Sequence, residues 1–155
     1  MQETELLKLF DSYSNMIYRL AFSYLRNTHD AEDVVQAVFM KLIEGKAKPI
    51  YGKERAFLTQ ITINYCKDVL RMAWRKRVDP LDNDIVFEAK EDRELFDVVM
   101  ALPDKYRIVV HLHYYENYSF PEIAEFLGIS SSAVSMRMHR ARNILKAKLR
   151  EDCYE

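Results

Sequence analysis

Apolar residues recur at intervals of three and four along most of this 155-residue chain, the spacing of helices that bury one face. The first stripe consists of Leu6, Phe10, Tyr13, Ile17, Leu20 and Tyr24. It breaks at Asn27 and Thr28, and a second stripe ends at Gly45. This second stripe consists of Ala31, Val34, Val35, Val38, Phe39 and Leu42. The pattern therefore predicts two amphipathic helices, the second with a polar opposite face that is free for a partner.

A loop and a third helix are predicted next. Pro49 and Gly52 mark residues 45–53 as a loop. The helix is expected from about Glu54 to Arg77, with a buried stripe of Leu58, Ile61, Tyr65, Val69 and Met72. Three such helices are enough to close one small domain.

Residues 78–92 lack sustained periodicity and belong to an acidic stretch, so we interpret them as a linker. Apolar periodicity resumes at Leu95, and Pro103 interrupts it once before it continues. The predicted fold is all-α, with two small helical domains at 1–77 and 93–155.

The stretch FPEIAEFLGISSSAVSMRMHRARNILKAKL, residues 120–149, carries signals for two helices joined by a tight corner. Ser119 and Glu122 have the spacing of a capping box at the start of the first helix. Gly128 suits a helix end that needs positive φ, and Ser130 is a natural N-cap for the next helix. These are the parts of a helix-turn-helix.

In a helix-turn-helix the second helix enters the major groove of DNA, with its first turns toward the base edges. The candidates for base contacts are Ser131, Ser132, Ser135, Met136, His139 and Arg140. The candidates for phosphate contacts are Arg137, Arg142, Lys146 and Lys148. The alternative is a solvated basic face on a C-terminal helix. The capping box, the glycine corner and the absence of acids from residues 130–150 together favour DNA binding.

Charge is segregated along the chain although its net value is only −1. Residues 45–77 and 130–150 are basic, and the acidic stretch lies between them. The small net charge argues weakly against nucleic acid, but two basic blocks predict two surfaces for a polyanion.

Catalysis is disfavoured by the absence of any nucleophile, metal or phosphate-loop spacing. His111 and His113 are two apart, which directs them to different faces of a helix, so we expect surface or boundary positions. No metal or cofactor is expected. Cys66 and Cys153 are isolated thiols, and no apolar run is long enough to span a bilayer. A cytoplasmic location is therefore expected, without membrane insertion.

Two blocks of the sequence resemble conserved regions of bacterial RNA polymerase sigma factors of the small extracytoplasmic-function (ECF) type. DAEDVVQAVFMKL (30–42) and FLTQITINYCKDVLR (57–71) resemble region two. ALPDKYRIVVHLHYYENYSFPEIAEFLGISSSAVSMRMHRAR (101–142) resembles region four. The resemblance implies an initiation factor, not an enzyme. Such a factor acts as a monomer: it binds core RNA polymerase, recognises and melts promoter DNA, and is associated with the nucleoid when bound to polymerase.

The resemblance also implies partners. Region two binds the β′ coiled coil of core polymerase through the helix at 30–42, and the β flap is a further contact. Asp33 and Gln36 match positions of the coiled-coil contact, flanked by Asp30, Glu32 and Lys41. An anti-sigma protein is expected for the family.

Region two of the family reads the minus-ten promoter element and captures a base flipped out of the non-template strand. The implied residues are Lys46, Lys48, Tyr51, Lys53 and Arg55 near the loop, with Asn64, Lys67 and Arg71 on the third helix. A basic groove with a ring or amide for an unstacked base suits this role. Two alternatives stay open: Asn64 as a buried amide, and Tyr51 packed on the core.

Region four of the family reads the minus-thirty-five element, here through the residues named above for the helix-turn-helix. Ser135 stands where the family often has Lys or Arg, so a bidentate guanine contact is missing and the preferred element should differ. Asn117 replaces a frequent glycine but tolerates the same positive φ. The rival function is a stand-alone helix-turn-helix regulator that dimerises through its N-terminal helices, which leaves the basic block at 45–77 without a role.

Overall fold

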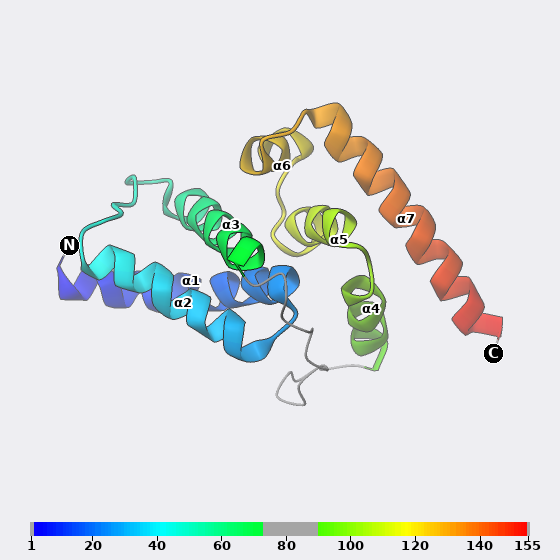
Figure 1. The fold of residues 1–155 in the computed structure, drawn as a ribbon, viewed down its shortest axis with the longest axis horizontal. Coiled ribbons are helices and arrows are strands. Elements are labelled where there is room, and N and C mark those ends of the chain that lie inside the picture. The colour runs from blue at the N-terminus through cyan, green and yellow to red at the C-terminus, as the bar shows by residue number, and fades with distance from the viewer. Residues whose placement is uncertain (1, 73–89, 155) are drawn as a thin grey trace. The chain divides into compact units, whose positions relative to one another are not determined.

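The computed structural model describes residues 2–72 and 90–154, with only the backbone for 90–94 and 150–154. The described residues form seven α-helices and one π-helical turn without a strand, which confirms the all-α prediction (Figure 1). The chain divides into two compact units, 1–82 and 83–155. The predicted acidic linker lies outside the described residues except for its last three positions, which begin α4. Among the described residues, no helix is both long and apolar enough to cross a membrane.

The first unit consists of α1 (Glu3–Leu25), α2 (Thr28–Ile43) and α3 (Glu54–Met72), each in contact with the other two. Its apolar core contains Met16, Ile17, Leu20, Ala21, Phe22, Tyr24, Leu25, Ala31, Val34, Val38, Phe39, Leu42, Leu58, Ile63 and Cys66. The predicted stripe of α1 is thus buried only from Met16 onward. Phe10, one turn and a half earlier, is 46% exposed because the N-terminal half of α1 leaves the core.

A short corner joins α1 to α2. Arg26 adopts a left-handed conformation with φ 53°, and its N–H donates to the carbonyl of Phe22. The side chain of Asn27 then accepts the N–H of Asp30 at 2.8 Å, so Asn27 is the N-cap of α2. The sequence placed the break correctly at Asn27 but did not identify its capping role.

The buried face of α3 differs from the predicted one. Leu58, Thr59, Thr62, Ile63 and Cys66 are buried, whereas the predicted Ile61, Tyr65 and Val69 are half-buried and Met72 is exposed. The prediction was wrong because it treated threonine as a surface residue. Each hydroxyl donates to a carbonyl one turn earlier, Thr59 to Arg55 at 2.8 Å and Thr62 to Leu58 at 2.7 Å. Both threonines can therefore face the core with their donors satisfied.

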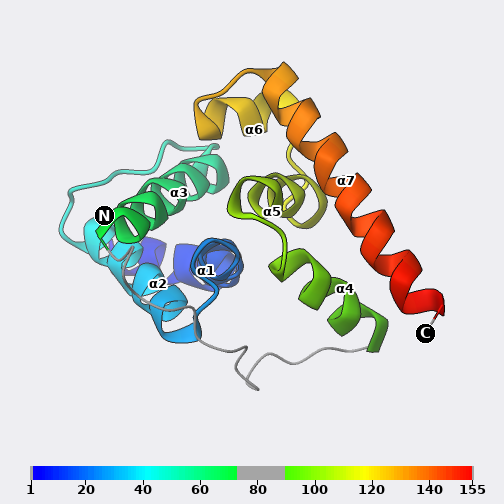
Figure 2. The same ribbon diagram turned by 45° about the vertical axis from the view of Figure 1, so that its right-hand side comes forward.

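The second unit consists of α4 (Lys90–Met100), α5 (Asp104–Val110), the π-helical turn η1 (His111–Tyr115), α6 (Phe120–Leu127) and α7 (Ser131–Tyr154). In Figure 2 the long α7 runs past α5, with α6 near its start and α4 near its end. Its apolar core contains Val99, Met100, Leu102, Ile108, Val109, Val110, Leu112, Tyr118, Ile123, Ala124, Val134, Met138 and Ala141.

Polar side chains are buried in the central helix formed by α5 and η1. Arg107 is 1% exposed and donates to the carbonyl of Leu102 at 2.8 Å and to Asp104 at 2.6 Å. His111 is also buried, with its Nε2 3.6 Å from Oε1 of the buried Glu116. The expected surface or boundary position of His111 is therefore wrong. The reason is tertiary: α4 and α7 pack on α5 and α6 packs on η1, so the central helix buries most of its surface.

Burial raises the pKa of the Cys66 thiol to about 12. The thiol is neutral in the folded protein at pH 8, so we expect it to resist iodoacetamide in a Cys153→Ser variant until the chain unfolds. Rapid alkylation of the native variant would contradict this expectation.

The raised pKa also predicts a pH dependence. Below the unfolded thiol's pKa, about 8.5, both states are protonated and the stabilisation is complete. Above it the unfolded chain ionises first, so the free energy of unfolding, relative to Cys66→Ala, should fall by about 1.4 kcal/mol per pH unit. Urea titrations of both proteins between about pH 8 and pH 11, a range that begins below the ordinary thiol pKa and ends above it, measure this difference.

Candidate nucleic-acid and partner interfaces

An apolar groove lies on the surface between α1 and α2. Its volume is about 660 Å³, and it is lined by Phe10, Ser14, Asn15, Tyr18, Glu32, Val35, Gln36, Phe39, Met40 and Ile43. Met40 is 54% exposed and Ile43 is 62% exposed. The rings of Phe10 and Phe39 meet edge to face, with 5.1 Å between their centroids. The predicted polar character of this face of α2 is wrong, since apolar side chains occupy its centre.

The residues predicted to bind core polymerase do not share one surface. Glu32 and Gln36 line the groove. Asp33 is exposed one position further around α2, and Asp30 is half-buried in the first turn. The ammonium of Lys41 lies 5.2 Å from the ring centroid of Tyr65, which places it against α3. The apolar half of the groove was not predicted, because it depends on which part of α1 leaves the core.

The loop between α2 and α3 turns at two glycines in the left-handed region, Gly45 with φ 73° and Gly52 with φ 82°. Lys46, Lys48 and Lys53 are exposed along it. The Nζ of Lys46 lies 2.8 Å from Glu44, and this hydrogen bond raises the pKa of the lysine. The loop is thus basic, with part of its charge compensated by Glu44.

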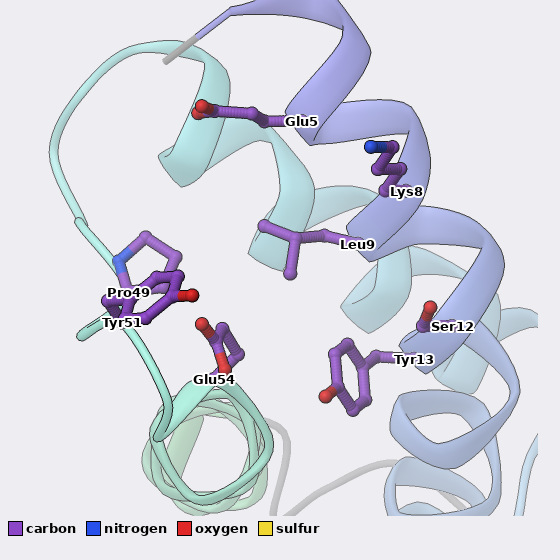
Figure 3. A pocket seen from close by; sticks show the side chains of 8 residues that line it. All are labelled: Glu5, Lys8, Leu9, Ser12, Tyr13, Pro49, Tyr51 and Glu54. Carbon is purple, nitrogen blue, oxygen red and sulfur yellow. The ribbon is translucent and has the colours of Figure 1, made fainter.

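Tyr51 is 98% exposed at the tip of this loop, so the alternative that it packs on the core is wrong. It stands at a pocket of about 450 Å³ between the loop and α1, lined by Glu5, Lys8, Leu9, Ser12, Tyr13, Pro49, Tyr51 and Glu54. Figure 3 shows Pro49 and Tyr51 on one side of this pocket and Leu9 and Tyr13 on the other. Two carboxylates in the lining disfavour a phosphate, whereas a flat uncharged group fits aromatic and apolar walls.

The predicted residues of α3 fall on two faces. Asn64, Lys67 and Arg71 are exposed, and their spacing of three and four places them on one face. The Oδ1 of Asn64 accepts a hydrogen bond from Gln60 at 3.0 Å, so the buried-amide alternative is wrong. Arg71 forms an ion pair with Asp68. Arg55 is half-buried in the first turn, one turn before the buried Thr59, and is not part of this face.

The corner between α6 and α7 has the predicted helix-turn-helix geometry. Ser119 and Glu122 form a reciprocal capping box, with N–H to side-chain distances of 3.0 and 3.3 Å. Gly128 has φ 68°, and the hydroxyl of Ser130 accepts the N–H of Ala133 at 3.0 Å. Asn117 has φ 62°, as expected for its replacement of glycine. The signals in the sequence therefore identified each of these turns.

The recognition helix α7 buries Val134, Met138 and Ala141 against the unit. The burial fades beyond them, since the predicted inward residue Leu149 is 38% exposed. The predicted DNA-contacting residues on the exposed side of α7 are Ser131, Ser132, Ser135, Met136, His139, Arg140, Arg142, Lys146 and Lys148. Arg137 is half-buried and lies at the edge of this side.

Asn143 was not predicted. It is exposed on α7, and its amide nitrogen lies 3.3 Å from Nε2 of His139, one turn earlier. The spacing of four between a histidine and an asparagine, in a basic stretch without acids, was the signal that could have revealed it. In the described parts of the chain, no cluster of three His, Cys, Asp or Glu side chains is placed to hold a metal ion.

A helical unit with an apolar groove and a basic loop, followed by a helix-turn-helix unit, is the architecture of a DNA-binding protein of transcription. Comparisons with known proteins agree. The family model described as Sigma-70 region 2 matches residues 9–76, and that described as Sigma-70, region 4 matches residues 92–145. The chain belongs to the sigma-70 family of RNA polymerase sigma factors, in its ECF group.

Individual relatives support the same group. The ECF RNA polymerase sigma factor SigW of Bacillus subtilis (strain 168) is 29% identical, over 92% of this chain and 88% of that protein. SigV of the same organism, named an RNA polymerase sigma factor, is 28% identical over 87% and 85%.

Two solved structures share the fold. The sigma factor RpoE from Bartonella quintana, in complex with the anti-sigma factor NepR, gives a TM-score of 0.79 at 17% identity over 94% of this chain and 97% of that one. CnrH, in complex with the cytosolic domain of CnrY, gives 0.67 at 26% identity over 97% and 91%.

The capping box at Ser119 is exposed, so its contribution can be measured without opening a cavity. We expect Ser119→Ala to lower the free energy of unfolding by about 1 kcal/mol, because two backbone donors lose their partners or alignment. Urea unfolding followed by circular dichroism measures this loss. Ser132→Ala, an exposed serine inside α7, is the matched control and should change stability by less than about 0.5 kcal/mol. Equal effects of the two variants would contradict the capping role.

Proposed function

We propose that this protein is a promoter-specificity factor: it binds core RNA polymerase, directs it to promoters, and assists local melting and initiation. The observation that carries this proposal is the presence, in one chain of the sigma-70 family, of two exposed basic surfaces, one on the loop and α3 and one on α7, and of a separate apolar groove. A stand-alone regulator needs only the helix-turn-helix. It leaves the groove, the basic loop and the exposed Asn64 face without a task.

The groove between α1 and α2 is the proposed binding site for the β′ coiled coil. An apolar centre with a polar rim suits a helix that lays an amphipathic face into it. Met40 and Ile43 supply exposed apolar area, and Glu32 and Gln36 supply polar contacts at the edge. Asp33 extends this contact beyond the groove. For the second unit, a β-flap contact is proposed from membership of the family alone, as is an anti-sigma partner for the free factor.

The first unit is also proposed to hold the minus-ten element as a single strand. Lys48 and Lys53 on the loop and Lys67 on α3 would track the sugar–phosphate backbone. Tyr51 offers a fully exposed ring for an unstacked base, and the adjoining pocket can take a flat uncharged group.

The second unit is proposed to read the minus-thirty-five element with the exposed side of α7 in the major groove. The serines at its start donate or accept with either base of a pair. Met136, 54% exposed, can contact the C5-methyl group of thymine. Without arginine at position 135, the preferred element should depend less on a guanine contact.

The experiment that tests the proposal is co-elution with bacterial core RNA polymerase. The wild-type protein should co-elute, and Gln36→Arg should weaken the complex more than about tenfold, because the longer charged side chain would extend from the edge of the groove over its apolar centre. Asp97→Arg is the matched control, a charge change at an exposed residue of the second unit, and should bind as the wild type does.

The outcomes separate the two functions. Wild-type protein that binds duplex DNA but not core polymerase would identify a stand-alone regulator. Binding to core that Gln36→Arg leaves intact would keep the initiation factor but move the contact away from the groove.

A second prediction concerns Tyr51. In complex with core polymerase, Tyr51→Ala should weaken binding of a single-stranded non-template oligonucleotide by about 1–3 kcal/mol, because one base loses its stacking partner. Tyr51→Phe should retain the affinity, since it keeps the ring. Ile50→Ala, at the neighbouring exposed loop residue, is the control. The oligonucleotide is taken from a promoter selected with the wild-type holoenzyme, and fluorescence anisotropy measures its binding. Equal losses for Ile50→Ala and Tyr51→Ala would refute a stacking role.

A further inference from the structure

A tyrosine of the central helix accepts a hydrogen bond from an arginine of the recognition helix α7. The Nε of Arg142 in α7 donates to the hydroxyl of Tyr114 in η1, at 3.1 Å. The guanidinium carbon lies 5.9 Å from the centroid of the same ring. Tyr114 is 53% exposed, and Arg142 is exposed as well. This contact therefore contributes little to the core, yet it spans 28 residues of sequence.

The bond uses the inner nitrogen of the guanidinium. A guanidinium carries five N–H donors, and one N–H from each of its two terminal nitrogens forms the edge that binds a phosphate with two parallel bonds. With Nε occupied by the tyrosine, that terminal edge is still available to a ligand. The contact thus fixes the side chain without consuming the donors that recognise phosphate.

A second arginine–tyrosine pair involves the other flank of α7. Arg140 donates a hydrogen bond that lowers the pKa of Tyr106, which belongs to α5. Residues 140 and 142 are separated by about 200° around a helix, so the two arginines lie on opposite flanks. A helix in the major groove has a phosphate backbone on each side. Both arginines are then placed beside a backbone rather than toward the groove floor.

We infer that Tyr114 is a positioning residue, which holds the guanidinium of Arg142 in the conformation that binds a DNA phosphate. The inference rests on the proposed DNA-binding function of α7. A free arginine side chain samples many rotamers, and immobilising it at an interface lowers affinity by roughly two- to tenfold. Because Tyr114 already restricts the side chain of Arg142 in the free protein, less affinity is lost when DNA binds.

The test is a double-mutant cycle on a short mixed-sequence DNA duplex, with the dissociation constant measured over a series of salt concentrations. Phosphate contacts do not depend on sequence, so neither promoter nor polymerase is required. Arg142→Ala should weaken binding and reduce the slope of log affinity against log salt by about 0.9, because one phosphate contact is lost. Tyr114→Phe should weaken binding about threefold with an unchanged slope, because the contact forms from a less ordered side chain.

The two effects should not add. In the Arg142→Ala background, Tyr114→Phe should have no effect on affinity, since nothing remains to position. Arg142→Lys, which keeps the charge but lacks the Nε donor, should resemble Tyr114→Phe in both affinity and slope. Tyr115→Phe, at the next residue of η1, is the matched control and should bind like the wild type.

Three results would overturn the inference. Tyr114→Phe could weaken binding equally in the Arg142→Ala background, it could leave the wild-type affinity unchanged, or Arg142→Ala could leave the salt slope unchanged. A general loss of structure would appear as a lower melting temperature and as equal effects in both backgrounds. Failure of this cycle leaves co-elution with core polymerase untouched, so it is distinguishable from failure of the proposed function.

Discussion

Apart from the central helix formed by α5 and η1, the described helices form the core with one face and leave the opposite face exposed, where the proposed partners would bind. Small units bury a limited fraction of their surface, so this division leaves little apolar area for stability. Local hydrogen bonds relieve the constraint. The hydroxyls of Thr59 and Thr62 donate to backbone carbonyls within α3. The guanidinium of Arg107 donates to the carbonyl of Leu102 and to Asp104. Polar residues can then lie on the buried face of a helix, while apolar residues such as Met40 lie on the exposed face.

The parts of the fold that could be predicted from the sequence are those determined by local chemistry. The capping box at Ser119, the corner at Gly128 and the cap at Ser130 each need only neighbours within a few residues, and all three were predicted. The face of α3 was mispredicted because side chain–backbone bonding of threonine overrides simple hydropathy. His111 was misplaced because its burial depends on helices that pack around it from distant parts of the chain.

The candidate sites follow the same rule. The spacing of Asn64, Lys67 and Arg71 was sufficient to place them on one face of α3. The apolar lining of the groove could not be predicted, since it requires Phe10 to leave the core while Val35 is only half-buried beside it. The Tyr114–Arg142 bond was equally out of reach, because it joins helices whose relative rotation is set by tertiary packing.

The π-helical turn has a consequence for how this unit can vary. In η1 the N–H of Glu116 bonds to the carbonyl of His111, which accommodates one residue more than an α-helical turn. Deleting a residue there would rotate the preceding side chains by about 100° relative to the following turn, and Tyr114 would no longer face α7. A recognition helix exchanged between relatives would therefore keep its arginine geometry only if the central helix, with its wide turn, were exchanged too. If α7 reads DNA as proposed, the unit to exchange is therefore the central helix together with α7, not α7 alone.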